Sequence, residues 1–144
     1  MRPDSTPHLQ SAALPWRRDA KGRISVLVVT TRRSRRWSIP KGNAAAHLSL
    51  AETAAKEAFE EAGVAGTISP LPAAVFRTTK RAAPGTALLE VWVFLLEVTG
   101  RAKRWPERGE RDGKWVTAKR AAKLLAEPAL ADLCRRLAER RAAG

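Results

Sequence analysis

An apolar segment, TALLEVWVFLLEV at residues 86–98, constrains the fold of this chain more than any other feature. It is the longest apolar run in the sequence, and it is too short to span a bilayer as a helix. A second run, ISVLVVT at residues 24–30, is rich in β-branched residues that favour strands. We therefore expect a β-sheet with residues 86–98 as a central strand.

Further strands are expected on both sides of these two runs. Residues 11–17 and 24–30 flank the turn signal at residues 19–22, so they are predicted to form a hairpin. The remaining extended pieces are expected at residues 37–39, 67–78 and 114–117, with loops at residues 40–48, 79–85 and 101–111. The loop at residues 79–85 contains Lys80, Arg81, Pro84 and Gly85.

Three helices complete the predicted fold. Ser49 is a suitable N-cap and Glu52 completes a capping box, so a helix is expected over residues 50–62, ending at Gly63. Shorter helices are expected near residues 118–126 and 128–141, the second with Cys134 on its apolar face. The mixture of elements predicts an α+β fold in a single domain at residues 11–144, preceded by a flexible arm at residues 1–10.

The charge of the chain indicates the chemistry of its partners. Its 144 residues carry a formal net charge of +13, with a pI near 11.3, which favours binding to polyanions. The single cysteine excludes an internal disulfide, and the N-terminus lacks the apolar segment of a signal peptide. We expect a cytoplasmic protein that is not bound to a membrane. Nucleic acid is a possible but less favoured partner than a phosphorylated small molecule.

The segment KEAFEEAGV at residues 56–64 concentrates acidic residues in this basic chain. Glu57, Glu60 and Glu61 lie at spacings of three and four, which place them on one face of a helix. One interpretation is a solvated helix face, with Glu52, Lys56 and Glu60 forming a ladder of ion pairs. The other is a metal-binding site, because carboxylate oxygens are preferred ligands of Mg²⁺.

Residues 42–64 resemble the motif of the Nudix hydrolase family, G-x5-E-x7-R-E-U-x-E-E-x-G-U, in which U is apolar. Gly42 corresponds to the first glycine, and Gly63 and Val64 to the closing pair. The carboxylates of the motif fall on Glu57, Glu60 and Glu61, and Ala58 occupies the first apolar position. The resemblance implies a Nudix-type α/β/α sandwich with a central mixed β-sheet.

Two positions depart from the motif. Leu48 stands where the family has its first glutamate, and Lys56 stands where it has arginine. In the family, that arginine helps to orient the loop and the catalytic helix. Lysine retains the charge without the planar, bidentate guanidinium, and leucine accepts no ion pair. We interpret these changes as altered support of the loop in an active enzyme, with a retired scaffold that only binds as the alternative.

The resemblance extends to the flanking segments RRWSIPKG at residues 35–42 and WPERGERDGKW at residues 105–115. These are similar to the diphosphoinositol polyphosphate phosphohydrolase-like branch, particularly its bacterial members. The resemblance implies that Glu57, Glu60 and Glu61 bind Mg²⁺ or Mn²⁺, and that Glu57 or Glu60 orients or deprotonates the attacking water. Glu107 and Glu110 lie where some relatives supply another acid, although a solvated loop is the favoured interpretation for each.

The implied reaction is cleavage of a phosphoanhydride bond in a highly phosphorylated substrate, of the diphosphoinositol polyphosphate or diadenosine polyphosphate type. Arginine binds phosphate through two parallel hydrogen bonds, so basic residues near the motif are candidate ligands. The candidates for substrate binding are Arg17, Arg32, Arg33, Arg35, Arg36, Lys41, Gly42, Arg77, Lys80 and Arg81. Two alternatives remain: a catalytically weak module that binds RNA or another polyanion, and a pyrophosphohydrolase of RNA 5′ ends.

Overall fold

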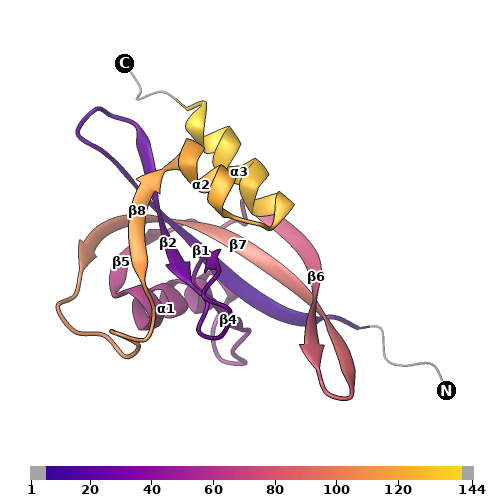
Figure 1. Cartoon of the computed structure of the whole chain (residues 1–144). Helices are drawn as coiled ribbons and strands as arrows, with labels where there is room; N and C mark the ends of the chain where they lie inside the picture. The colour runs from indigo at the N-terminus through magenta and orange to yellow at the C-terminus, as the bar shows by residue number, and fades with distance from the viewer. Residues whose placement is uncertain (1–5, 141–144) are drawn as a thin grey trace.

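The computed structural model describes residues 6–140, in which one mixed sheet lies between two layers of helices (Figure 1). The strands are β1 (His8–Arg18), β2 (Ile24–Thr30), β3 (Trp37–Ser38), β4 (Lys41–Asn43), β5 (Val64–Ile68), β6 (Ala74–Ala82), β7 (Gly85–Arg101) and β8 (Gly113–Thr117). The helices are α1 (Leu50–Ala62), α2 (Ala118–Leu124) and α3 (Pro128–Ala138). None of the helices in the described part of the chain is long and apolar enough to cross a membrane.

Strands β1 and β7 form the centre of the sheet. They run parallel, from His8 beside Leu89 to Trp16 beside Glu97, and β7 also pairs with β5 and β6 in antiparallel register. On its other side β1 pairs antiparallel with β2 and β4, so the path across the sheet is β3-β2-β1-β7-β5. The prediction that residues 86–98 form a central strand is confirmed.

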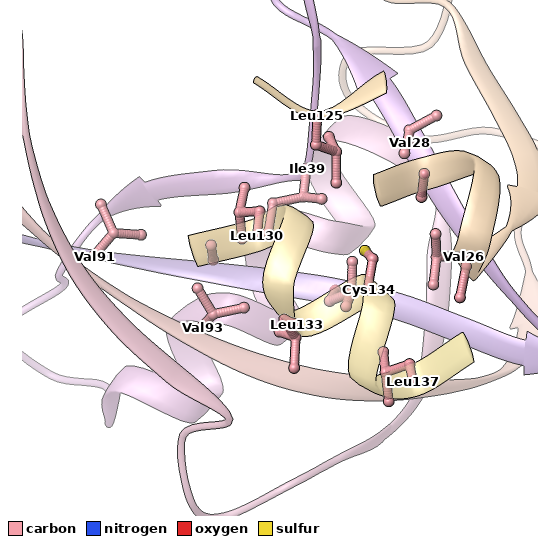
Figure 2. Packing of buried hydrophobic residues seen from close by; sticks show 14 of the residues in the cluster. Val26, Val28, Ile39, Val91, Val93, Leu125, Leu130, Leu133, Cys134 and Leu137 are labelled. Carbon is pink, nitrogen blue, oxygen red and sulfur yellow. The ribbon is translucent and has the colours of Figure 1, made fainter. Parts of the chain in front are cut away.

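The two faces of the sheet are covered by different helices because side chains alternate along each strand. On one face Val26, Val91 and Val93 pack with Leu133 and Cys134 of α3, as Figure 2 shows. On the other face the small residues of α1, Ala54, Ala58 and Ala62, pack against Ala13, Leu27, Val64, Phe94 and Leu96. The predicted α/β/α sandwich is therefore confirmed.

The ends of α1 are fixed by the residues that the sequence indicated. The Ser49 hydroxyl accepts the backbone N–H of Glu52, and the Glu52 carboxylate accepts the backbone N–H of Ser49. Gly63 ends the helix with φ of 72°, a conformation that favours glycine. These two caps set where the glutamates of α1 lie relative to the sheet.

Several predicted boundaries were wrong, and the last two helices end at Leu124 and Ala138 rather than near residues 126 and 141. Residues 8–10 belong to β1 rather than to a flexible arm, because they pair with β7, and residues 1–5 lie outside the described part of the chain. The expected strand at residues 67–78 is divided into β5 and β6 around Pro70 and Pro72, which cannot donate to a strand ladder. Residues 79–82 continue β6 instead of forming a loop, and residues 41–43 pair with β1.

Candidate active site

Glu57 and Gly42 are in close contact at the point where β4 passes α1. A Cβ atom built on residue 42 would lie 2.3 Å from the carboxyl carbon of Glu57. The backbone at Gly42 is in turn fixed by pairing with Ser11 of β1. Glycine is therefore needed at position 42 to leave room for the carboxylate, which is a reason for the first glycine of the motif that the sequence alone does not reveal.

Glu61 is the most buried acid of α1, with 5% of its surface exposed. Its Oε2 accepts the backbone N–H of Lys41 at 3.1 Å, and its Oε1 lies 3.5 Å from Nε of Arg111. Oε2 is therefore hydrogen-bonded to the backbone of β4, while Oε1 has a cationic neighbour in the loop before β8. This pair of contacts fixes the orientation of the Glu61 side chain.

The carboxyl groups of Glu57 and Glu61 both have raised pKa values. Burial raises the pKa of Glu61 to about 8, with further contributions from Glu107 and Glu57, while Arg111 and the Lys41 N–H oppose the shift. Burial, and then the charge of Glu60, also raises the pKa of Glu57. The carboxyl groups of Glu57 and Glu61 are close enough to share a hydrogen bond. Carboxylates held together in this way are stabilised by a proton or by a cation.

Glu60 has a different environment. Its Oε1 lies 2.9 Å from Nζ of Lys56, and its side chain is 31% exposed. Of the ladder of Glu52, Lys56 and Glu60 considered for this helix, only the Lys56–Glu60 pair forms, because the Glu52 carboxylate is engaged in the capping box. Glu57 and Glu61 turn toward β4. Lys56 is paired with Glu60 of its own helix, and its ammonium lacks the planar guanidinium of the arginine that the motif has at this position.

The loop between β7 and β8 supplies two site residues, Glu107 and Arg111, that the sequence alone did not place in the site. Glu107 was interpreted as solvated, but its side chain is only 17% exposed and its Oε1 lies 3.0 Å from Nε of Arg111. Its backbone N–H also donates to the carbonyl of Glu60 at 2.9 Å. Glu110 is more exposed and pairs with Arg32 at 2.6 Å. The segment resembling the family, residues 105–115, was the available signal for Glu107 and Arg111.

A cleft of about 690 Å³ opens beside Glu61. Its basic lining residues are Arg32, Arg33, Arg36, Lys41, Lys80 and Arg111. Its apolar lining includes Ile39, Phe76, Leu89, Val91 and Leu130, and Gln10 and Glu127 contribute polar groups. Since the sheet order is β3-β2-β1-β7, with β6 paired to β7, the arginines after β2 and the apolar residues of β6 and β7 lie on opposite sides of β1.

Five of the expected substrate ligands do not line this cleft, and one of them is Gly42, whose neighbour is the carboxylate of Glu57. Arg77 pairs with Glu90 at 3.1 Å, and Arg17 lies over the ring of Trp115, 3.9 Å from its centroid. Arg35 pairs with Asp112, and Arg81 lies near the end of the β6–β7 hairpin. Along β6, alternation sends the side chains of Arg77 and Arg81 to the face opposite Lys80, and Arg35 lies in the connection between β2 and β3.

The donor set of the site fits a hard divalent cation. Among residues 6–140, no three His, Cys, Asp or Glu side chains converge into a preformed metal cluster. The carboxylates of Glu57 and Glu61 are nevertheless adjacent and desolvated, and Gly42 leaves open space for one of them. Oxygen donors with unbalanced negative charge are the ligands that Mg²⁺ and Mn²⁺ prefer.

A mixed sheet between helices, with a glutamate-bearing helix beside a basic cleft, places this chain in the class of α/β/α sandwich proteins. The chain belongs to the NUDIX domain family, whose model matches residues 7–137. It is 34% identical over 110 residues to the mitochondrial Nudix hydrolase 12 of Arabidopsis thaliana, which covers 74% of this chain. The aligned part is 54% of that relative, so the chain spans about half its length.

Solved structures share the fold at lower identity. The Ap4A hydrolase of C. elegans superposes with a TM-score of 0.64 at 18% identity, covering 91% of this chain and 96% of that one. The NUDIX domain of Shewanella oneidensis NrtR, complexed with ADP ribose, also has a TM-score of 0.64 at 18% identity, covering 91% and 88% of the two chains. At this level of identity, these similarities show a shared fold.

Proposed function

We propose that this protein is a metal-dependent pyrophosphohydrolase that cleaves a phosphoanhydride bond in a highly phosphorylated substrate. The observation that carries this proposal is the contact of Glu57 with Gly42 beside Glu61, at the edge of a cleft with six basic side chains. The acids provide a place for a cation, and the bases provide a place for phosphates. A solvated helix face would need neither the space at Gly42 nor the buried carboxylate of Glu61.

Glu57, Glu60 and Glu61 are the proposed ligands of Mg²⁺ or Mn²⁺. When bound, the cation supplies positive charge that neutralises phosphate oxygens and lowers the pKa of a coordinated water. Of the two candidate bases, we favour Glu57, because burial raises its pKa and its carboxylate adjoins Gly42, whereas Glu60 is paired with Lys56. In this assignment a carboxylate oxygen of Glu57 accepts the proton of the attacking water.

The basic residues of the cleft position the substrate. Arg33, Arg36, Lys41 and Lys80 line the cleft, and no ion pair with a carboxylate is recorded for them in residues 6–140. Arg32 is shared between Glu107 at 3.3 Å and Glu110 at 2.6 Å. We therefore assign phosphate binding chiefly to the four cations without such pairs, which donate to phosphate oxygens with their guanidinium and ammonium groups.

The apolar side of the cleft favours a dinucleoside polyphosphate over a diphosphoinositol polyphosphate. Phe76, Leu89 and Leu130 offer contact area to a flat ring but no donor to a phosphate. A fully phosphorylated inositol carries charge around its whole ring, so contact with this surface would desolvate phosphates without compensation. The fold shared with the Ap4A hydrolase named above supports a diadenosine polyphosphate as the first compound of a substrate panel.

The decisive experiment compares three substrates with and without metal. Diadenosine polyphosphate, diphosphoinositol polyphosphate and 5′-triphosphorylated RNA are incubated with wild-type protein and with the variants Glu57→Gln and Glu61→Gln. We expect metal-dependent turnover that falls by about a hundredfold or more in each variant, as for other positioned acid–base groups. Glu97→Gln, on the exposed part of β7, is the matched control.

Two outcomes contradict the proposal. If wild-type protein turns over none of the three compounds with Mg²⁺ or Mn²⁺, the catalytic assignment fails, and salt-sensitive RNA binding without hydrolysis identifies a binding module instead. If Glu57→Gln retains full turnover, the site lies elsewhere. Preference for the RNA would keep the chemistry and replace the proposed substrate.

For localisation, we propose the cytoplasm. The single thiol, Cys134, is on the buried face of α3, and burial raises its pKa to about 11. An unpaired cysteine suits a reducing compartment. Fractionation of cells that express the full-length tagged protein tests this proposal, and recovery in an organelle or secreted fraction contradicts it.

A further inference from the structure

Arg111 connects three separate elements at the edge of the site. Its Nε lies 3.5 Å from Oε1 of Glu61 and 3.0 Å from Oε1 of Glu107, and its Nη1 donates to the carbonyl of Thr30 at 3.1 Å. The side chain is only 15% exposed. One guanidinium thereby joins α1, the end of β2 and the loop before β8.

The backbone that carries Arg111 is held on both sides. Before it, the N–H of Glu107 donates to the carbonyl of Glu60 at 2.9 Å. After it, the N–H of Asp112 donates to the hydroxyl of Thr30, and the N–H of Thr30 donates to the carbonyl of Asp112, both at 2.9 Å. A guanidinium anchored in this way holds its partner carboxylates in place instead of following them.

Arg111 is the cationic neighbour of one of the two carboxylate oxygens of Glu61. The Lys41 N–H holds Oε2, so loss of Arg111 would leave Oε1 without its cationic neighbour, close to the carboxylates of Glu57 and Glu107. Without this neighbour, no cation would hold Oε1 in its present orientation, and the Glu61 side chain would be free to rotate away from Glu57 and Glu107. The planar fork of arginine suits this position, since a lysine ammonium cannot contact two carboxylates and a carbonyl in the same geometry.

No residue of the motif on α1 supplies a guanidinium. Lys56 is paired with Glu60 of its own helix, and Leu48 has no charge. We propose that Arg111 is a positioning residue, which orients Glu61 and Glu107 for cation binding from the loop before β8 and so replaces the arginine missing at position 56. This inference rests on the proposed function of Glu61 as a metal ligand.

The test measures Mn²⁺ affinity by titration calorimetry, together with kcat, KM and Tm, for Arg111→Lys and Arg111→Gln. Residues that orient metal ligands typically change metal affinity or activity by 10–100-fold, so we expect Mn²⁺ affinity and kcat to fall by about tenfold or more in both variants. KM should change by less than about threefold, because phosphate binding is assigned to other cations. Arg108→Gln is the control, since Arg108 is in the same loop and bonds to the carbonyl of Lys103.

The outcomes separate positioning from two other roles. Wild-type Mn²⁺ affinity with a large rise in KM identifies Arg111 as a phosphate ligand and overturns the inference. A fall in Tm equal to that of Arg108→Gln, with Mn²⁺ affinity unchanged in both, identifies a merely structural residue and also overturns it. If wild-type protein hydrolyses no substrate, the proposed function fails, yet the Mn²⁺ titration still decides whether Arg111 orients Glu61.

Discussion

Gly42 and Glu57 occupy adjoining space, and the Cβ of any larger residue at position 42 would lie 2.3 Å from the carboxyl carbon of Glu57. The clash involves the end of a flexible side chain, so the carboxylate can move away without disruption of the backbone. A substitution at position 42 should therefore displace the Glu57 carboxylate without disrupting the fold. The contact makes the first glycine of the motif a requirement of the site rather than of a turn.

Gly42→Ala should leave the protein folded but displace Glu57. We expect a Tm near that of wild type and a fall in kcat of about a hundredfold, comparable to loss of the Glu57 carboxylate. Gly100→Ala is the control, because a Cβ built at residue 100 contacts nothing within 4 Å. Equal activity of the two alanine variants would show that Glu57 has no role that depends on its position.

The stability of the metal-free protein should decrease as the pH rises from about 4.5 to about 8. The pKa of Glu61 is raised to about 8 in the folded protein from 4.5, so over this interval the folded state binds the proton and the unfolded state does not. The free energy of unfolding contributed by Glu61 therefore falls as the pH increases. Thermal melts in chelator, across this range, should show a smaller decrease for Glu61→Gln than for wild type; an identical slope would contradict the assignment.

Cations of the cleft and cations outside it should differ in their effect on KM. Arg36 lines the cleft, whereas Arg77 pairs with Glu90 away from it. A hydrogen bond to a charged group contributes about 1.5–3 kcal/mol, so Arg36→Gln should raise KM roughly tenfold or more. Arg77→Gln should leave KM within about twofold, since exposed ion pairs contribute little. An equal rise in both variants would indicate general charge attraction instead of a defined phosphate site.

Restoring arginine at position 56 should have little effect. Lys56 pairs with Glu60 on the surface of α1, and Arg111 already contacts Glu61. Surface pairs at this spacing contribute about 0.3–0.5 kcal/mol, so Lys56→Arg should change kcat and Tm only slightly. An increase in kcat of tenfold or more would mean that the motif position still limits the enzyme and that Arg111 does not replace it.

The α1 helix shows what local sequence determines. The capping box of Ser49 and Glu52, the alanines of α1 and the terminal Gly63 act within a few residues of one another, and all three were read correctly. The central position of β7 also followed from its apolar length. Local propensity and hydrophobic pattern are therefore sufficient for the helix that carries Glu57, Glu60 and Glu61 and for the central strand, whereas the α/β/α layering was implied by the resemblance to the family.

Only the tertiary structure decided which charges meet. Arg111 and Thr30 are 81 positions apart, and Lys41 and Glu61 are 20 apart, so strand pairing and loop docking bring them together. The same pairing turns Arg77 toward Glu90 and away from the cleft, although the sequence places it close to Lys80. The sequence by itself determined the acidic helix and the sheet, because these depend on near neighbours. The orientation of Glu61 and the membership of the cleft depend on contacts between distant segments, which exist only once the sheet has formed.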